Sequence, residues 1–466
     1  MLSQRSNQTP QRTSTPCRVE YLGLVACTFA VSALLLSIPL GAPLRSEVST
    51  ALLVFLGTGL ILIRSVGFRF RGVLPVLLFA GAGIASSALS DFPKQSSLRS
   101  ASGLALLATF FAAQPIAATP WAMRVLRGAA SVAVFALLID MMAQVWGESS
   151  LLQPRLAPTG HTRFAGSLPN PNEVACIAIL APLSVAGQAL VSRSLASRSL
   201  MSRSLLSHGT HRPFALLNAV FVTASALLVA FYSGSRATFL GVNAALSMML
   251  WLTRRRALLG ALSVSACLVL CAWIFDLGSV RVRVLDTFAI HDDWRLRVWQ
   301  VAWHSFLDAP IFGQGPSVFF EVHERARVLP ASSGITPAPG GMPWAHCVPL
   351  EILCERGLVG FACAAWIVTT VLRHLRRALS HPKTRPTAVP LASAIAAIAI
   401  MSLVDLSLMK DWCIYLFALV GGLVCGVGCE PSPSEASSNV APTTTSCDET
   451  STTGDESSRS AASIVR

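Results

Sequence analysis

The sequence predicts an all-α, polytopic integral membrane protein. Hydrophobic residues make up 53% of the chain, whereas charged residues make up only 13%. Long apolar stretches recur as far as residue 428, and a helix needs about 20 such residues to cross a hydrocarbon core about 30 Å thick. A transmembrane β-barrel would instead show short segments in which apolar and polar residues alternate. The chain is therefore expected to cross the membrane as helices.

About twelve membrane-spanning helices can be delimited from the apolar stretches. They are expected at residues 21–41, 48–63, 72–90, 101–118, 128–146, 173–191, 214–232, 237–252, 257–275, 347–371, 388–408 and 412–428. Residues 1–20 then form a cytoplasmic N-terminal segment, and residues 21–429 form the membrane domain. Residues 430–466 are rich in Ser and Thr and poor in apolar residues, so we expect a disordered tail.

The positions of Arg and Lys predict the orientation, because short cytoplasmic loops carry the positive excess. Basic groups occur before the first predicted span and then after every second span. They lie within residues 5–18, 64–71, 124–127, 193–212, 254–256 and 373–385. Both termini are therefore expected in the cytoplasm. The net charge of +13 is spread over these loops instead of lining one groove, so no nucleic-acid partner is predicted.

One long connection, residues 276–345, lies on the opposite, non-cytoplasmic side. Residues 294–303 within it are expected to form a helix. At helical spacing Trp299, Trp303 and Phe306 fall on one stripe, with Arg295 one turn before Trp299. An amphipathic helix at the membrane interface, with aromatic rings at headgroup depth, explains these tryptophans. The following run, residues 310–315, predicts a helix break and a flexible turn.

Two shorter segments on the same side carry candidate binding residues. In residues 160–172, paired prolines prevent an early helix, and Asn172 can cap a helix that begins at Glu173. A sugar-binding role for Asn170 or Asn172 stands beside that structural interpretation. In the turn 233–236, Arg236 either extends to the membrane interface or binds a phosphate with its planar donor fork.

The end of the long loop brings ionisable residues to the mouth of the tenth predicted span. His346 lies at this mouth, and Glu351 and Glu355 share one helical face just below it. Such groups are costly at membrane depth and mark functional sites by default. The alternative for the two glutamates is a Glu and Arg network, with Arg356, that only holds helices together. An imidazole titrates near neutral pH, which makes His346 a candidate general base.

Together these segments resemble the O-antigen ligase and polymerase superfamily. The resemblance covers about residues 160–370. It rests on the motifs Gly166–Asn172, Ser233–Arg236, Arg295–Trp299, Pro310–Gly315 and His346–Gly360. It implies a GT-C-like fold with many spans, located in the inner membrane of a bacterium, with the loop 276–345 in the periplasm.

The resemblance also implies a reaction and its site. An oligosaccharide on an undecaprenyl-diphosphate carrier is transferred to an acceptor hydroxyl of a glycan, the lipid A core or a protein. Arg236 matches the essential loop arginine of the family, and Arg295 and Arg297 are further candidates for contacts with the diphosphate. His346 matches the histidine that activates the acceptor for inverting attack, with Glu351 or Glu355 to orient it. Neither a metal nor another cofactor is implied.

Several alternatives remain open from the sequence. Family members commonly have Asn directly after the histidine, whereas this chain has Cys347, so one loop donor is missing. A ligase and a polymerase share the donor and differ in the acceptor. A transporter or flippase of lipid-linked substrates is a different class, although its expected internal repeat is not found. A structural membrane protein would tolerate replacement of Arg236 and His346.

Overall fold

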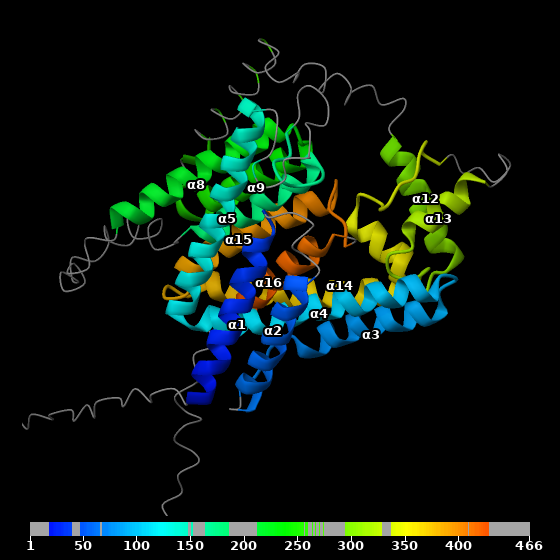
Figure 1. The fold of residues 1–466 in the computed structure, drawn as a ribbon, viewed down its shortest axis with the longest axis horizontal. Coiled ribbons are helices and arrows are strands. Elements are labelled where there is room, and N and C mark those ends of the chain that lie inside the picture. The colour runs from blue at the N-terminus through cyan, green and yellow to red at the C-terminus, as the bar shows by residue number, and fades with distance from the viewer. Residues whose placement is uncertain are drawn as a thin grey trace, which may run out of the picture. The chain divides into compact units, whose positions relative to one another are not determined.

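The computed structural model describes most of the chain between residues 18 and 427. The described residues are 18–39, 47–65, 68–147, 151, 164–185, 212–255, 257–259, 263, 266, 270, 274, 294–328, 337–408 and 410–427. The predicted tail lies outside them, as does most of the predicted span 257–275. Every regular element in the described part is a helix, as the sequence predicts (Figure 1).

The helices follow the predicted order of apolar segments. They are α1 (Arg18–Ser37), α2 (Glu47–Ser65), α3 (Val73–Leu89), α4 (Pro93–Ala118), α5 (Pro120–Gly147), the 3-10 helix η2 (Pro171–Cys176), α6 (Ile177–Ser184), α8 (Arg212–Ser233), α9 (Arg236–Thr253), α12 (Trp294–Asp308), α13 (Phe319–Arg327), α14 (Val348–Ser380), α15 (Arg385–Ser402) and α16 (Asp411–Gly426).

Five of the described helices are long and apolar enough to cross a membrane. They are α1, α5, α14, α15 and the part of α8 from Leu216 to Ser233. Shorter apolar helices occur within α2, α3 and α4, across η2 and α6, and at α16. The fold of the described residues is therefore that of an all-helical integral membrane protein. The predicted number of twelve spans stays a prediction.

The predicted span 388–408 is wrong at its C-terminal end. Helix α15 ends at Ser402, because the backbone amides of Val404, Asp405 and Leu406 all bond to the carbonyl of Met401. This tight turn stops the helical pattern of bonds between residues four apart. Residues 403–408 and Lys410 therefore belong to a loop between α15 and α16, and not to the end of a span.

Helices α9 and α15 pack antiparallel to each other. The guanidinium of Arg385, at the start of α15, donates to the carbonyl of Leu252 at the end of α9, 2.9 Å away. Near the other ends, Gly241 allows close approach, because a Cβ there would collide with the side chain of Met401. The start of α9 and the end of α15 therefore lie at the same end of the helix bundle.

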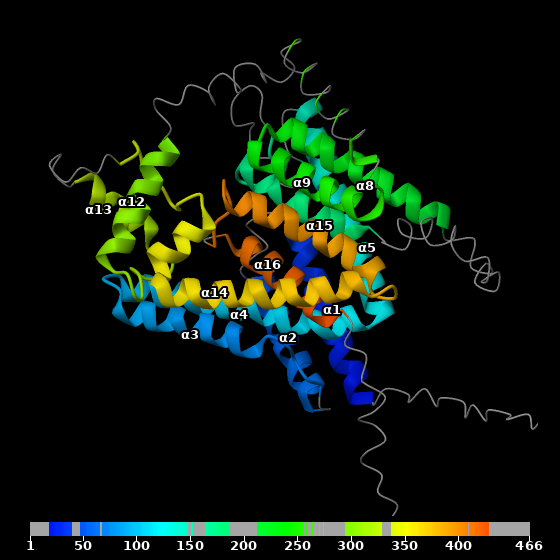
Figure 2. The ribbon, with the colours of Figure 1, turned by 180° about the vertical axis from the view of Figure 1, so that it is seen from behind.

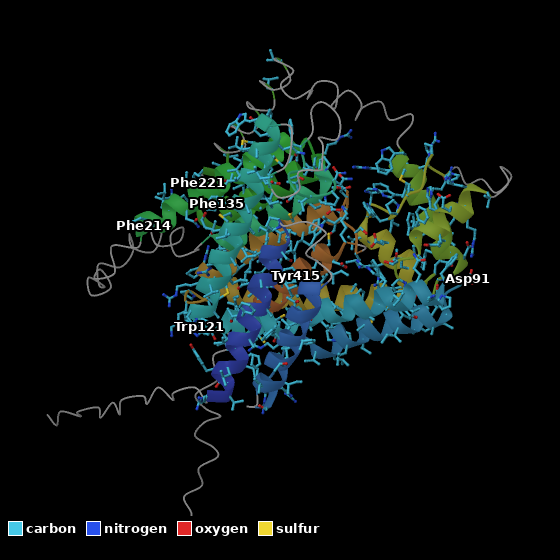
Figure 3. All side chains as sticks on the ribbon, in the orientation of Figure 1. Asp91, Trp121, Phe135, Phe214, Phe221 and Tyr415 are labelled. Atoms are coloured by element: carbon cyan, nitrogen blue, oxygen red, sulfur yellow. The ribbon has the colours of Figure 1, made fainter. Side chains whose placement is uncertain are left out.

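The ends predicted to be cytoplasmic meet at the opposite end. Arg71, which follows α2, lies 3.5 Å from His374 near the end of α14, and the Arg385–Leu252 contact joins α15 to α9. In the middle of the bundle, the hydroxyl of Tyr415 in α16 donates to the carbonyl of Val31 in α1, 2.5 Å away (Figure 3). These contacts agree with the prediction that the basic loops lie at one common end of the bundle. The assignment of that end to the cytoplasmic side of the membrane stays a prediction.

The long loop folds onto the bundle. Helix α12 forms where it was predicted, and Val298 and Val301 on it pack into one hydrophobic cluster with Phe319 of α13. Helices α12 and α13 lie over the start of α14 (Figure 2). Arg325 of α13 pairs with Asp91, which follows α3, at 2.7 Å (Figure 3). The described part of the loop is therefore docked on α14 and on the connection between α3 and α4.

The turn at residues 310–315 is held by α14, so the expectation of a flexible turn is wrong. Helix α14 is broken at Gly357, where φ is 60° and ψ is −163°. Four backbone hydrogen bonds of 2.8–3.2 Å join residues 310–315 to residues 354–359. A Cβ at Gly357 would collide with the carbonyl of Ile311. The break thus exposes backbone groups of α14, and the turn satisfies them.

Candidate functional site

His346 lies in a constrained position directly before α14. Its φ of 56° falls in the left-handed region, which residues other than glycine rarely adopt. Backbone strain of this kind is common at functional sites. The residue is 7% exposed. Its neighbour Cys347 takes the N-cap position of α14 without a side-chain cap. The backbone thus presents the imidazole at the mouth of the helix, as the sequence predicts.

The imidazole of His346 is paired with Asp405, a residue of the loop between α15 and α16. Nδ1 of His346 and Oδ1 of Asp405 are 2.9 Å apart, and Asp405 is 1% exposed. The indole nitrogen of Trp344 also lies 3.1 Å from Nδ1. A carboxylate only accepts a hydrogen bond and an indole only donates one, so Nδ1 can satisfy only one of them. The charge-assisted bond to Asp405 is the stronger, which assigns the proton to Nδ1 and leaves the lone pair on Nε2.

The surroundings of this pair favour a neutral imidazole beside an ionised carboxylate. Burial lowers the pKa of His346; Asp405 opposes this effect, while the charges of Lys410 and Arg295 add to it. The pKa of Asp405 is also below its usual range: burial by itself raises that pKa, but the bond to His346 and the charge of Lys410 outweigh burial. A neutral His346 with a free Nε2 can accept a proton.

Two tryptophan rings contact His346, and each carries a cation on it. The ring of Trp294 lies 4.8 Å from the imidazole, and the guanidinium of Arg295 is 5.5 Å from the same indole. The ring of Trp344 lies 5.4 Å from the imidazole, with the ammonium of Lys410 at 4.7 Å. Arg295 and Lys410 therefore each contact an indole ring that in turn contacts His346.

Arg236 is presented by the predicted tight turn. Helix α8 ends at Ser233, Gly234 has a φ of 56°, and the Ser235 hydroxyl accepts from the amide of Thr238 at 3.3 Å to cap α9. Arg236 is the first residue of α9 and is exposed. Within the part of the chain that the structure describes, its guanidinium has neither a hydrogen-bond partner nor an ion-pair partner. It is therefore open to a ligand.

Arg236 and the His346–Asp405 pair lie at the same end of the bundle. Gly241, which packs on Met401, follows Arg236 by five positions, about 7.5 Å along a helix at a rise of 1.5 Å per residue. Met401 precedes Asp405 by only four positions. The arrangement of α9 and α15 thus places Arg236 and Asp405 at one end of the bundle, and a shared site stays a prediction.

The other predicted binding residues have more distant or more structural positions. Arg297 is half-buried two positions after Arg295, and residues two apart lie on different faces of a helix. The cap is at Asn170 and not at Asn172: Oδ1 of Asn170 accepts from the amide of Asn172 at 2.8 Å, and η2 begins at Pro171. The prediction that Asn172 caps a helix from Glu173 is therefore wrong by two residues. The proline at the first helical position explains the earlier start.

Neither Glu351 nor Glu355 is bonded to His346. Glu351 is 0% exposed, and its Oε1 accepts from the amide of Leu408 at 2.7 Å. Glu355 is 2% exposed and faces Arg356 at 3.5 Å. Both carboxylates thus hold protein groups, which favours the structural alternative for them. Glu351 still bears on the site, because it fixes the loop that carries Asp405.

An apolar chamber adjoins the site. It has a volume of about 490 Å³ and lies between α3, α4, α14, α15 and α16. Val348 and Leu408 line it, and they follow His346 and Asp405 by two and three positions. Arg99 and Arg356 also reach its wall. The chamber can hold a hydrocarbon chain next to the polar pair.

Sequence reasoning missed Asp405 and Lys410. Both lie near the boundary between the last two predicted spans, and Asp405 was placed inside the span 388–408. An acid inside an apolar stretch is itself a signal of function, and it could have directed attention to this loop. Which basic or acidic group it meets depends on packing, so its partnership with His346 has no local signature.

The fold and this site define a polytopic helical membrane protein with a candidate His–Asp base at one end of its bundle. Residues 220–365 match the family model described as O-antigen ligase. This match confirms the resemblance for that part of the chain, which contains Arg236, Arg295 and His346. The comparison with curated proteins gives no match.

Proposed function

We propose that this protein transfers an oligosaccharide or polysaccharide from an undecaprenyl-diphosphate carrier to an acceptor hydroxyl at the periplasmic face of the inner membrane. The observation that carries the proposal is the buried His346–Asp405 pair, 2.9 Å apart, within and beside a domain of the O-antigen ligase family. Such a pair is the arrangement that a general base needs in order to keep one tautomer. The reaction is a glycosyl transfer without a metal or another cofactor.

In the proposed reaction, His346 acts on the acceptor. Nε2 takes the proton of the acceptor hydroxyl while the hydroxyl oxygen forms a bond to the anomeric carbon. The bond from that carbon to the diphosphate oxygen breaks, and the diphosphate leaves with the electron pair. Attack opposite to the leaving group inverts the anomeric centre. Asp405 keeps the proton on Nδ1 and stabilises the imidazolium that forms.

The arginines act on the donor. Arg236, open at the first turn of α9, and Arg295, beside His346, are the proposed contacts for the diphosphate, with Arg297 as a further candidate. Fixed guanidinium groups stabilise a leaving diphosphate because they remain charged and donate two parallel hydrogen bonds. The apolar chamber beside Val348 and Leu408 suits the isoprenoid tail. Asn170 and Asn172 remain candidate contacts for the sugar.

The proposed membrane topology rests on the positions of the basic residues in the loops. About twelve spans with basic cytoplasmic loops would place both termini in the cytoplasm and residues 276–345 in the periplasm. The contacts Arg71–His374 and Arg385–Leu252 support it, because they join ends that carry the basic groups. The site then lies at the other end, facing the periplasm.

The test is a surface-glycan profile of a strain that lacks this protein. The strain is complemented with wild type, with His346→Ala, or with His381→Ala as the control, since His381 is exposed just past the other end of α14. Wild type and His381→Ala are expected to restore the glycan, and His346→Ala is not, at equal protein levels. Restoration by His346→Ala would contradict the proposal and favour a transporter or a structural protein.

The same profile separates the two members of the superfamily. A polymerase acts on another lipid-linked repeat, so its loss leaves single repeats on the acceptor or carrier. A ligase acts on the lipid A core or a protein, so its loss leaves complete polymer on the carrier. The acceptor is therefore identified by the product that accumulates.

A further inference from the structure

Lys410 is a buried cation that the proposed mechanism does not use. It occupies the N-cap position of α16, and its amide bonds to the carbonyl of Ser407 at 3.3 Å. The residue is 7% exposed. Its ammonium lies 4.7 Å from the ring centre of Trp344 and 6.0 Å from that of Trp412. Two indole rings thus hold the side chain in place.

The ammonium of Lys410 has no polar partner within the described part of the chain. Neither a hydrogen bond nor an ion pair of its Nζ is found there, although Asp405 is near enough for its charge to be affected. Asp405 uses its Oδ1 for the bond to His346, and its buried Oδ2 has no hydrogen bond from Lys410 in the described part of the chain. A largely buried lysine normally pairs its ammonium with an anion, because desolvation of an unpaired charge is costly. The ammonium of Lys410 is therefore available to an anion from outside the described part of the chain.

Arg295 is a second cation near His346. The charges that act on the imidazole come from Asp405, Lys410 and Arg295. Lys410 and Arg295 are thus both near enough for their positive charges to act on His346. Each cation contacts an indole ring that also contacts the imidazole, Trp344 for Lys410 and Trp294 for Arg295. Both cations are therefore part of the surroundings of His346.

We propose that Lys410 and Arg295 form an anion subsite beside His346, in which Lys410 binds an oxyanion of the substrate. This inference rests on the proposed function. Two sources carry the required chemistry: the diphosphate of the donor, or a carboxylate on an acidic sugar next to the bond that is cleaved. The role of Lys410 is contact with substrate and not only an electrostatic effect on His346.

The experiment measures equilibrium binding to the purified full-length protein in detergent micelles. The probes are geranylgeranyl diphosphate, uncharged geranylgeraniol, and an oligosaccharide that ends in glucuronate together with its neutral counterpart. Lys410→Met is compared with wild type, with Lys410→Arg, and with Lys383→Met as the control, because Lys383 lies between α14 and α15 at the other end.

We expect Lys410→Met to bind an anionic probe roughly tenfold more weakly, the typical cost of one bond to a charged group. Binding of the uncharged probes stays unchanged, Lys410→Arg retains most of the affinity, and Lys383→Met behaves as wild type. A loss confined to the diphosphate assigns the subsite to the donor, and a loss confined to glucuronate assigns it to the sugar.

Equal affinity of folded Lys410→Met and wild type for both anionic probes would overturn the inference, even if the pH dependence of activity shifted. Lys410→Gln replaces Lys410→Met if the latter does not give monodisperse protein. Failure of wild type to bind any of the probes would count against the proposed function itself. If wild type binds the probes and substitution of Lys410 leaves their affinity unchanged, only the proposed subsite is ruled out, and the proposed function still stands.

Discussion

Nδ1 of His346 lies 2.9 Å from Oδ1 of Asp405, although 59 positions separate the two residues. The contact joins the start of α14 to the loop after α15. It gives the imidazole a fixed tautomer and a negative neighbour, and so distinguishes His346 from a histidine that merely lies near the membrane surface.

Asp405→Asn is expected to lower the transfer rate on the order of a hundredfold, because an amide no longer enforces the Nδ1–H tautomer. The dependence of the transfer rate on pH is expected to shift in a defined direction. Asp405 raises the pKa of His346, so its neutralisation lowers that pKa further, and the acidic limb of the rate moves to lower pH. Rates of purified protein measured across pH check both effects. An unchanged rate and profile would show that the pair has no part in catalysis.

Arg236→Lys is expected to lose at least about tenfold in rate, because an ammonium cannot donate two parallel bonds to a diphosphate. Arg254→Lys is the matched control, since Arg254 is an exposed arginine at the other end of α9. Steady-state rates with a lipid-linked donor provide the measurement. Full activity of Arg236→Lys would instead indicate a side chain that only extends to the membrane interface.

Glu351→Ala is expected to destabilise the protein by about 1–3 kcal/mol, because the partly buried amide of Leu408 loses its acceptor. The loop with Asp405 is then released, and activity falls as well. Glu351→Gln keeps an oxygen acceptor and should stay close to wild type. Thermal unfolding and transfer rates of both variants test this. Equal losses in both would mean that the negative charge, and not the bond to Leu408, is required.

Gly357→Ala is expected to cost at least about 2 kcal/mol of stability. Its φ of 60° is unfavourable for alanine, and the new Cβ would collide with the carbonyl of Ile311. Gly128→Ala is the control: Gly128 lies inside α5 with nothing within 4 Å of an added Cβ, so the change should be neutral or stabilising by up to about 1 kcal/mol. Unfolding midpoints in detergent compare the two variants. Similar midpoints would contradict the docking of residues 310–315.

Local patterns predicted the helices, the turn before Arg236, the helix of residues 294–303 and the position of His346. Apolar stretches of sufficient length must be helical in a membrane, because only a helix satisfies its own backbone. Helix ends were less predictable. The C-terminal end of α15 depends on three amides that converge on Met401, and an apolar sequence continues past that turn without a break.

The sequence by itself determined that the chain is a helical membrane protein, which of its loops are basic, and which residues match the motifs of the O-antigen ligase family. Only the tertiary structure decided that Asp405, and neither Glu351 nor Glu355, pairs with His346, that Lys410 adjoins them, and that residues 310–315 fill the break in α14. The physical reason is that these contacts join segments tens of positions apart. Side-chain type and helical period encode local structure, whereas the partner of a polar group is fixed by how whole helices pack.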